Sequence, residues 1–153
     1  MSKLALFGGN PVRTDPFPEW PRPTSELGES VLNTLQNENW GIGSDSIARF
    51  EEAFAAFHDA KHCISTSSGT TALWVALKAA GVKAGDEVII PAHTFTSSAY
   101  PFVKANARIV WADIDVATRV ISTETIAPCI SSRTRAIVVP HLYGFGADMP
   151  GIM

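Results

Sequence analysis

Short apolar runs rich in β-branched residues alternate along this chain with segments that have helical periodicity. In chain order, strands are predicted at residues 62–65, 87–90, 109–112 and 136–139, and helices at residues 71–80, 97–105 and 123–130. Strands separated by helices are typical of a mostly parallel sheet whose two faces are both covered. The sequence therefore predicts an α/β fold.

The first 24 residues are rich in proline, which fixes φ and removes a backbone hydrogen-bond donor. Residues 1–24 are therefore predicted to form an extended arm, with prolines at Pro11, Pro16, Pro18, Pro21 and Pro23. Helices are predicted at residues 26–35 and 46–57, with a turn at residues 40–43. The second helix is amphipathic, because its apolar residues recur at spacings of three and four: Ile47, Phe50, Phe54 and Phe57.

A run of hydroxyl side chains and one glycine stands directly before the helix predicted at residues 71–80. Its centre is Ser68, Gly69, Thr70 and Thr71. The first turn of a helix leaves backbone N–H groups unpaired and carries partial positive charge, so a phosphate at this place can accept several hydrogen bonds. Hydroxyl groups can add donors, and glycine lets the backbone approach closely. The alternative interpretation is an ordinary N-cap made by Ser67 or Ser68.

Other candidate residues follow the predicted strands. Phe95 can cover one face of a flat ring with its aromatic side chain, although it could instead be a core residue at the start of a helix. His93 can approach a ligand or simply bond a nearby carbonyl. Asp113 and Asp115 have no third ligand of matching spacing, so they are predicted to form a turn and no metal site is expected.

The composition excludes several classes of partner. The 12 basic and 15 acidic residues give a net charge of −3 without a basic run, so nucleic acid is not expected as a partner. No apolar stretch approaches the roughly 18 residues of a membrane helix, and no signal-peptide pattern begins the chain. A cytoplasmic protein without a membrane partner is predicted. Cys63 and Cys129 lie in separate apolar runs and are predicted to be buried free thiols.

Four motifs taken together have a family resemblance: "SSGTTAL", "GDEVIIPAHTFTSSA", "ARIVWADID" and "TRAIVVPHLYG". In this order they resemble the DegT/DnrJ/StrS aminotransferases, pyridoxal-phosphate enzymes that aminate keto-sugars and keto-cyclitols. The resemblance runs from about Phe7 to Met153, and "LFGGNPVR" with "FPEWP" is similar to the cyclitol and aminoshikimate branch. Members often have Asn-Gly-Thr-Ala where this chain has Ser68-Gly69-Thr70-Thr71, so one side-chain contact differs.

The resemblance implies a fold and a cofactor. Residues 25–153 would be an incomplete large cofactor-binding domain, a three-layer α/β/α domain of a fold-type I enzyme, without the C-terminal small domain. Pyridoxal phosphate would be held by Ser68, Gly69, Thr70 and Thr71 and covered by Phe95. The complete enzyme would be a homodimer that takes an amino group from glutamate or glutamine and gives it to a keto acceptor.

The catalytic groups are not expected among these 153 residues. A lysine that forms a Schiff base must be desolvated, whereas the five lysines lie in the arm, in loops or on predicted helix surfaces: Lys3, Lys61, Lys78, Lys83 and Lys104. The resemblance places that lysine, and the aspartate for the ring nitrogen, beyond Met153. The chain is therefore predicted to be an inactive amino-terminal part of the enzyme. A dehydratase or aminohydroxybenzoate-type synthase of the same family remains an alternative, as does a non-catalytic phosphate-binding or scaffold module.

Overall fold

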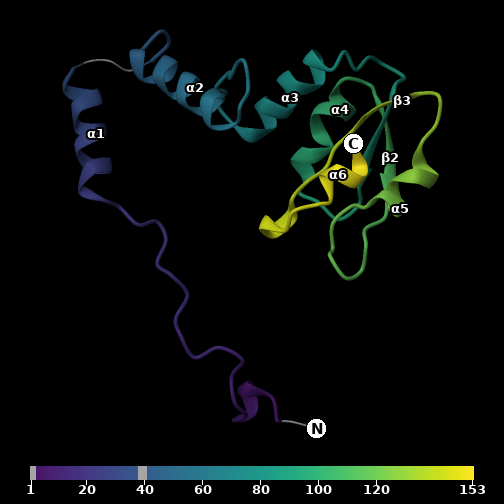
Figure 1. The fold of residues 1–153 in the computed structure, drawn as a ribbon, viewed down its shortest axis with the longest axis horizontal. Coiled ribbons are helices and arrows are strands. Elements are labelled where there is room, and N and C mark those ends of the chain that lie inside the picture. Colours follow the sequence, from purple (N-terminus) through teal and green to yellow (C-terminus); the bar gives the residue numbers. More distant parts are fainter. Residues whose placement is uncertain (1–2, 38–40) are drawn as a thin grey trace. The chain divides into compact units, whose positions relative to one another are not determined.

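The computed structural model describes residues 3–37 and 41–153. The chain divides into two compact units, Met1–Cys63 and Ile64–Met153 (Figure 1). The predicted turn at residues 40–43 lies partly outside the described residues, and its described part, Gly41 and Gly43, has positive φ angles of 100° and 87°. The extended arm of residues 1–24 and the cofactor domain from residue 25 remain predictions.

In residues 3–37 and 41–63, the first unit contains two α-helices after a largely irregular segment. A short 3₁₀ helix, η1 (Ala5–Phe7), is followed by α1 (Ser25–Gln36) and α2 (Asp45–Phe57). Helix α1 begins where the hydroxyl oxygen of Thr24 accepts a hydrogen bond from the amide of Leu27 at 3.2 Å. Both helices predicted in this region are confirmed.

The second unit is built on a parallel sheet of three strands in the order β2-β1-β3. Strand β1 (Glu87–Pro91) lies in the centre, between β2 (Arg108–Ala112) and β3 (Thr134–Ile137). Three of the predicted strands are therefore confirmed. Strand β3 begins and ends two residues earlier than predicted, although the amide of Val138 still donates to the carbonyl of Ile89 at 2.9 Å.

The strand predicted at residues 62–65 is wrong. This segment is irregular, and it is not one of the three strands in the described sheet. A strand needs backbone hydrogen bonds to a neighbouring strand. A short hydrophobic run does not show whether such a neighbour exists. Ile64, in the middle of the run, is 71% exposed instead of buried in a sheet.

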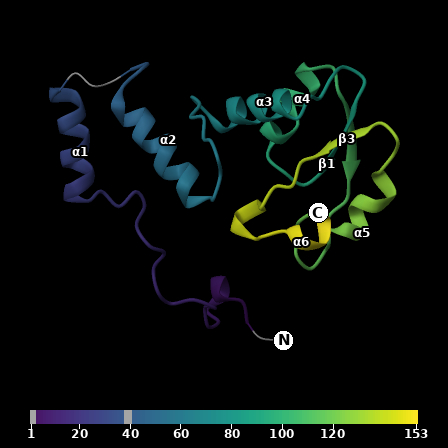
Figure 2. The same ribbon diagram turned by 45° about the horizontal axis from the view of Figure 1, so that its top comes forward.

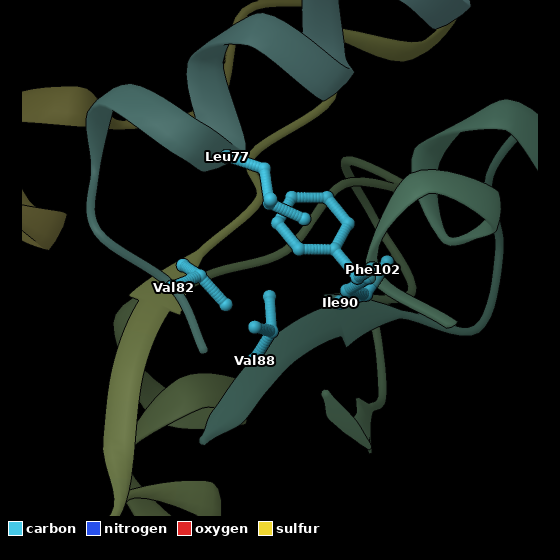
Figure 3. Close-up of a cluster of buried hydrophobic side chains, with 5 residues drawn as sticks. All are labelled: Leu77, Val82, Val88, Ile90 and Phe102. Atoms are coloured by element: carbon cyan, nitrogen blue, oxygen red, sulfur yellow. The ribbon is translucent and has the colours of Figure 1, made fainter. Parts of the chain in front are cut away.

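Helices cover both faces of the sheet. On one face, α3 (Gly69–Ala79) and α4 (Tyr100–Lys104) pack over Val88 and Ile90, and five side chains point toward one another there: Leu77, Val82, Val88, Ile90 and Phe102 (Figure 3). On the other face, α5 (Thr123–Ile126) and α6 (Met149–Ile152) pack over Ile89 (Figure 2). The prediction of three layers, α/β/α, is confirmed.

Two predicted helices are interrupted by proline. The segment predicted at residues 97–105 is a 3₁₀ turn, η2 (Thr96–Ser98), followed by α4, and Pro101 lies in the first turn of α4. The segment predicted at residues 123–130 is α5 followed by η3 (Ala127–Cys129), where Pro128 takes the equivalent place. Proline cannot donate to the preceding turn but fits the start of a helix, so each helix restarts there.

Two smaller expectations have mixed outcomes. Cys63 and Cys129 are free thiols, as predicted, but both are half-buried and not fully buried. In residues 3–37 and 41–153, no helix is long and apolar enough to cross a membrane.

A buried carboxylate links the amino ends of the three strands. Glu87, 4% exposed, accepts hydrogen bonds from the Ser131 hydroxyl and from Arg133, whose Nε and Nη2 lie 3.0 and 2.7 Å from its Oε1. Arg108, the first residue of β2, has its Nη1 3.6 Å from the same oxygen. The hydrogen bond from Ser131, followed by those from Arg133, lowers the pKa of Glu87 below its ordinary value.

This cluster makes the stability of the chain depend on pH. Because the folded state lowers the pKa of Glu87 from its ordinary 4.5, the ionised carboxylate stabilises the fold above that pH. The contribution is lost as the pH falls through the lowered pKa. We expect Glu87→Gln to reduce the urea midpoint at neutral pH and to flatten its decline in acid. Asp113→Asn, at an exposed carboxylate, is the control, and an unchanged acid profile in Glu87→Gln would contradict this account.

Candidate functional site

The candidate site begins at the amino terminus of α3. Ser68 is the N-cap, and its hydroxyl oxygen accepts a hydrogen bond from the amide of Thr71 at 3.1 Å. The amide of Ala72 donates to the carbonyl of Ser68 at 2.9 Å. The N-cap interpretation of Ser68 is therefore confirmed, but a cap does not exclude an anion, because it satisfies only part of the first turn.

The amides of Gly69 and Thr70 are left as donors. They stand in the first turn of α3, where an α-helix provides no acceptor for them. The hydroxyls of Ser68 and Thr71 lie 3.0 Å apart and share one hydrogen bond. Since two hydroxyls carry two protons, the pair keeps one proton beyond the shared bond, for which a ligand competes with the Ser67 hydroxyl, 3.4 Å from that of Thr71.

The space at Gly69 is open. A Cβ atom placed on this glycine would meet nothing within 4 Å. A mainly apolar hollow of about 250 Å³ lies along the side of α3, lined by Thr70, Thr71, Trp74, Tyr100 and Pro101, and Gly69 does not line it. Unpaired amides at the positive end of a helix, next to open space, suit a phosphate group. The residues present therefore fit the phosphate of the cofactor that the sequence implies.

Phe95 lies on the chain just after the carboxyl end of β1. Its side chain is 72% exposed, so the alternative that it is a core residue is wrong. An exposed aromatic ring at the carboxyl edge of a parallel sheet is placed where ligands of such sheets bind. Its contact with a cofactor ring stays a prediction.

A hydrogen bond joins the α3 terminus to the segment that carries Phe95. The hydroxyl of Thr70 donates to the hydroxyl oxygen of Ser97 at 2.9 Å. Nearby, the hydroxyls of Thr94 and Ser98 lie 2.8 Å apart. The sequence does not single out Ser97, because no local pattern links it to a residue 27 positions earlier. The only signal was the density of hydroxyl residues from Thr94 to Ser98.

The remaining candidates have structural partners. Nδ1 of His93 lies 3.4 Å from the carbonyl oxygen of Arg119, as in the simpler of its two interpretations. Asp115 accepts from the amide of Thr118 at 2.7 Å, and that bond lowers its pKa. Asp113 accepts from the amide of Ile114 at 2.8 Å. Both aspartates therefore shape the loop, and the described residues contain no cluster that could hold a metal ion.

The five lysines of the chain are all exposed. The ammonium groups of Lys78 and Lys104 lie 5.5 and 5.9 Å from the ring centroids of Trp74 and Tyr100, on the helix surfaces. An exposed ammonium stays hydrated, whereas a lysine nucleophile needs a desolvated site. None of the five has the surroundings of a Schiff-base lysine.

A sequence profile of the DegT/DnrJ/EryC1/StrS aminotransferase family matches residues 23–153. The chain belongs to this family. The resemblance noted from the four motifs is thereby confirmed.

Members of the DegT/DnrJ/EryC1/StrS family with curated functions match nearly the whole chain. The L-glutamine:2-deoxy-scyllo-inosose aminotransferase of Streptomyces fradiae is 41% identical over 158 residues, which cover 99% of this chain and 37% of that protein. The L-glutamine:scyllo-inosose aminotransferase of Streptomyces griseus is 37% identical over the same shares of both chains. This chain therefore spans about 37% of the length of these relatives.

Solved structures of similar proteins have the same fold. An aminotransferase from Psychrobacter cryohalolentis superposes with a TM-score of 0.84 at 38% identity, over 90% of this chain and 35% of that one. A 3-amino-5-hydroxybenzoic acid synthase gives a TM-score of 0.83 at 36% identity, over 90% and 36%. The chain is thus part of a fold-type I α/β domain, as predicted.

The cap at Ser68 can be tested separately from any ligand. Ser68→Ala removes the acceptor for the Thr71 amide and should lower the free energy of unfolding by about 1 kcal/mol. Ser68→Asn should keep most of that stability, because asparagine is an equally good N-cap. Ser67→Ala is the control, since the Ser67 hydroxyl forms a 3.4 Å hydrogen bond with the Thr71 hydroxyl but does not cap the Thr71 amide. Urea unfolding measures all three, and equal losses in Ser67→Ala and Ser68→Ala would contradict the cap.

Proposed function

We propose that this chain is the amino-terminal part of a pyridoxal-phosphate-dependent aminotransferase that moves an amino group from glutamine to a keto-cyclitol of the inosose kind. The observation that carries the proposal is the α3 terminus, where the first-turn amides of Gly69 and Thr70 have no helical acceptor, the space at Gly69 is open, and Thr70 is bonded to Ser97, two residues after the exposed Phe95. The donor and acceptor are taken from the names of the Streptomyces relatives. When bound, pyridoxal phosphate supplies the aldehyde and the electron-withdrawing ring that such a transfer requires.

The chain's own residues bind and orient the cofactor. The amides of Gly69 and Thr70 donate to phosphate oxygens, and the partial positive charge of the helix terminus favours the negative phosphate. The hydroxyl pair of Ser68 and Thr71 adds one donor. Hydrogen bonds to a charged group are among the stronger ones, so two or three of them fix the phosphate end of the cofactor.

Phe95 orients the other end. A flat aromatic side chain offers a large apolar area to a pyridine ring, and offset stacking limits the tilt of that ring. Its 72% exposure leaves the face of Phe95 available for this contact. The phosphate donors and Phe95 together would hold the ring in one orientation relative to the sheet.

The chemical steps need groups from outside this chain. We infer that the lysine nucleophile is supplied by a longer protein, because the five lysines here are exposed, and the family resemblance implies the same for the acidic partner of the ring nitrogen. The complete enzyme would act as a homodimer, as the family resemblance implies. This chain then contributes binding and orientation, and none of its residues is assigned as a catalytic acid, base or nucleophile.

Two of the solved structures support a second candidate function within the family. The 3-amino-5-hydroxybenzoic acid synthase has nearly the same TM-score as the aminotransferase, and a GDP-4-keto-6-deoxymannose-3-dehydratase superposes at 0.74 with 26% identity. The residue at the nucleophile position of the longer protein separates aminotransfer from dehydration, since lysine is expected for the former and histidine for the latter.

A non-catalytic phosphate-binding module would instead give no absorption band on mixing with pyridoxal phosphate.

The open space at Gly69 gives a direct test of the phosphate contact. In the longer protein, Gly69→Ala should weaken pyridoxal-phosphate binding by about 1–3 kcal/mol, because the methyl group narrows the approach to the amides. The apo protein should be as stable as wild type or more so, by up to about 1 kcal/mol, because alanine favours a helix. Titration by absorbance and urea unfolding measure the two effects.

A matched control for that test is Gly28→Ala. Gly28 lies in α1, and a Cβ atom there also meets nothing within 4 Å. This substitution should favour the helix in the same way and leave the cofactor affinity unchanged. If both glycine variants bound pyridoxal phosphate like wild type, the α3 terminus would be a helix cap only.

The isolated chain is expected to show no transaminase turnover. Its residues would bind the cofactor, whereas the nucleophile and the acidic partner are inferred to come from residues beyond these 153. The measurement is release of the keto acid from glutamine or glutamate in the presence of pyridoxal phosphate and an inosose-type ketone. Sustained release would show that one of the five lysines is a nucleophile after all.

A further inference from the structure

We propose that Ser97 is a positioning residue of the pyridoxal-phosphate site, which takes the hydroxyl proton of Thr70 and thereby ties the phosphate-binding end of α3 to the segment carrying Phe95. The inference rests on the proposed function, because it assumes that pyridoxal phosphate is the ligand. It assigns a role to a residue that neither the motifs nor the N-terminal helix geometry identifies.

A side-chain hydrogen bond joins Thr70 to Ser97. The hydroxyl of Thr70 donates to the oxygen of Ser97 at 2.9 Å, and both side chains are half-buried. Thr70 lies in the first turn of α3, and Ser97 lies in η2, two residues after Phe95. Helix α3 also packs against η2. The bond therefore spans the two elements that would hold opposite ends of the cofactor.

The Thr70 hydroxyl has only one proton to donate. In this structure that proton is given to Ser97. Thr70 therefore offers the phosphate its backbone N–H and not its hydroxyl. The bond to Ser97 restrains the Thr70 side chain, and with it the first turn that carries the amides of Gly69 and Thr70, before any ligand arrives. Groups held in place in advance bind more tightly, because less ordering remains to be done on binding.

The turn that follows Phe95 is held by hydrogen bonds of its own. The amide of Ser98 donates to the carbonyl of Phe95 at 2.9 Å, and the buried Ser98 hydroxyl lies 2.8 Å from that of Thr94. These bonds close a tight turn around Phe95. The hydrogen bond from Thr70 consequently ties the α3 terminus to a turn that has hydrogen bonds of its own.

The test is a cycle of four proteins in the longer enzyme: wild type, Thr70→Val, Ser97→Ala and the double variant. If the two hydroxyls act through one another, each single substitution should weaken pyridoxal-phosphate binding by a similar factor, about tenfold. The double variant should be no weaker than either single one, within about a factor of two. Ser97→Thr should restore binding, because threonine keeps the acceptor.

Two further measurements separate positioning from loss of structure. Circular dichroism in the absorption band of the bound cofactor should change in both single variants, because it reports the orientation of the ring. Urea unfolding of the apo proteins should show the same non-additivity without any cofactor. Thr96→Ala, which removes an exposed hydroxyl from η2, is the matched control and should leave binding and dichroism unchanged.

The outcomes distinguish this inference from the proposed function. A much larger loss in Thr70→Val than in Ser97→Ala would mean that the Thr70 hydroxyl binds the phosphate directly, and it would overturn the role of Ser97. Additive losses in the double variant would overturn it as well. If wild type failed to bind pyridoxal phosphate at all, the proposed function would fall. If Ser97→Ala did not fold, Ser97→Cys replaces it in the cycle, with an intermediate loss expected because a thiol is a weaker acceptor.

Discussion

Complete burial of the central strand is the constraint on which the second unit depends. All five residues of β1 are buried, including the carboxylate of Glu87. Such a strand needs neighbours at both edges and apolar cover on both faces, and β2, β3 and the two helical layers supply them. Polar and aromatic groups can therefore contact a ligand from the segment after the carboxyl end of β1. Phe95 and Ser97 lie in that segment.

The sheet and its cover could be predicted largely from local patterns. The run Glu87–Pro91 reads as a buried strand because it is apolar and β-branched, and the apolar pattern after Gly69 reads as a helix. Two kinds of error remained. Residues 62–65 have the composition of a strand but no ladder in the described sheet, and composition cannot report pairing. Pro101 and Pro128 are visible in the sequence and mark the start of a new helical segment. Helical periodicity continues across both prolines, so periodicity alone predicts helices that are too long.

The site was only partly visible in the sequence. Hydroxyls before a helix indicate a cap or an anion site, and the structure shows that Ser68 provides the cap while the amides of Gly69 and Thr70 remain available. The exposure of Phe95 could not be read from its neighbours, because burial depends on what packs above it. The bond from Thr70 to Ser97 could not be predicted either, since it is a tertiary contact between separate elements.

The strand order also bears on how the chain folds as it is made. The central strand β1 is synthesised before either of its neighbours, so it leaves the ribosome with both edges unpaired. Its second edge stays unpaired until β3 is synthesised. The carboxylate of Glu87 likewise has no partner in Arg133 until 46 further residues have been added. During that interval the most apolar strand of the sheet is open to the wrong partner. A slow pause in translation between β1 and β3 would lengthen this exposure, whereas a pause after β3 would give the ion pair time to close.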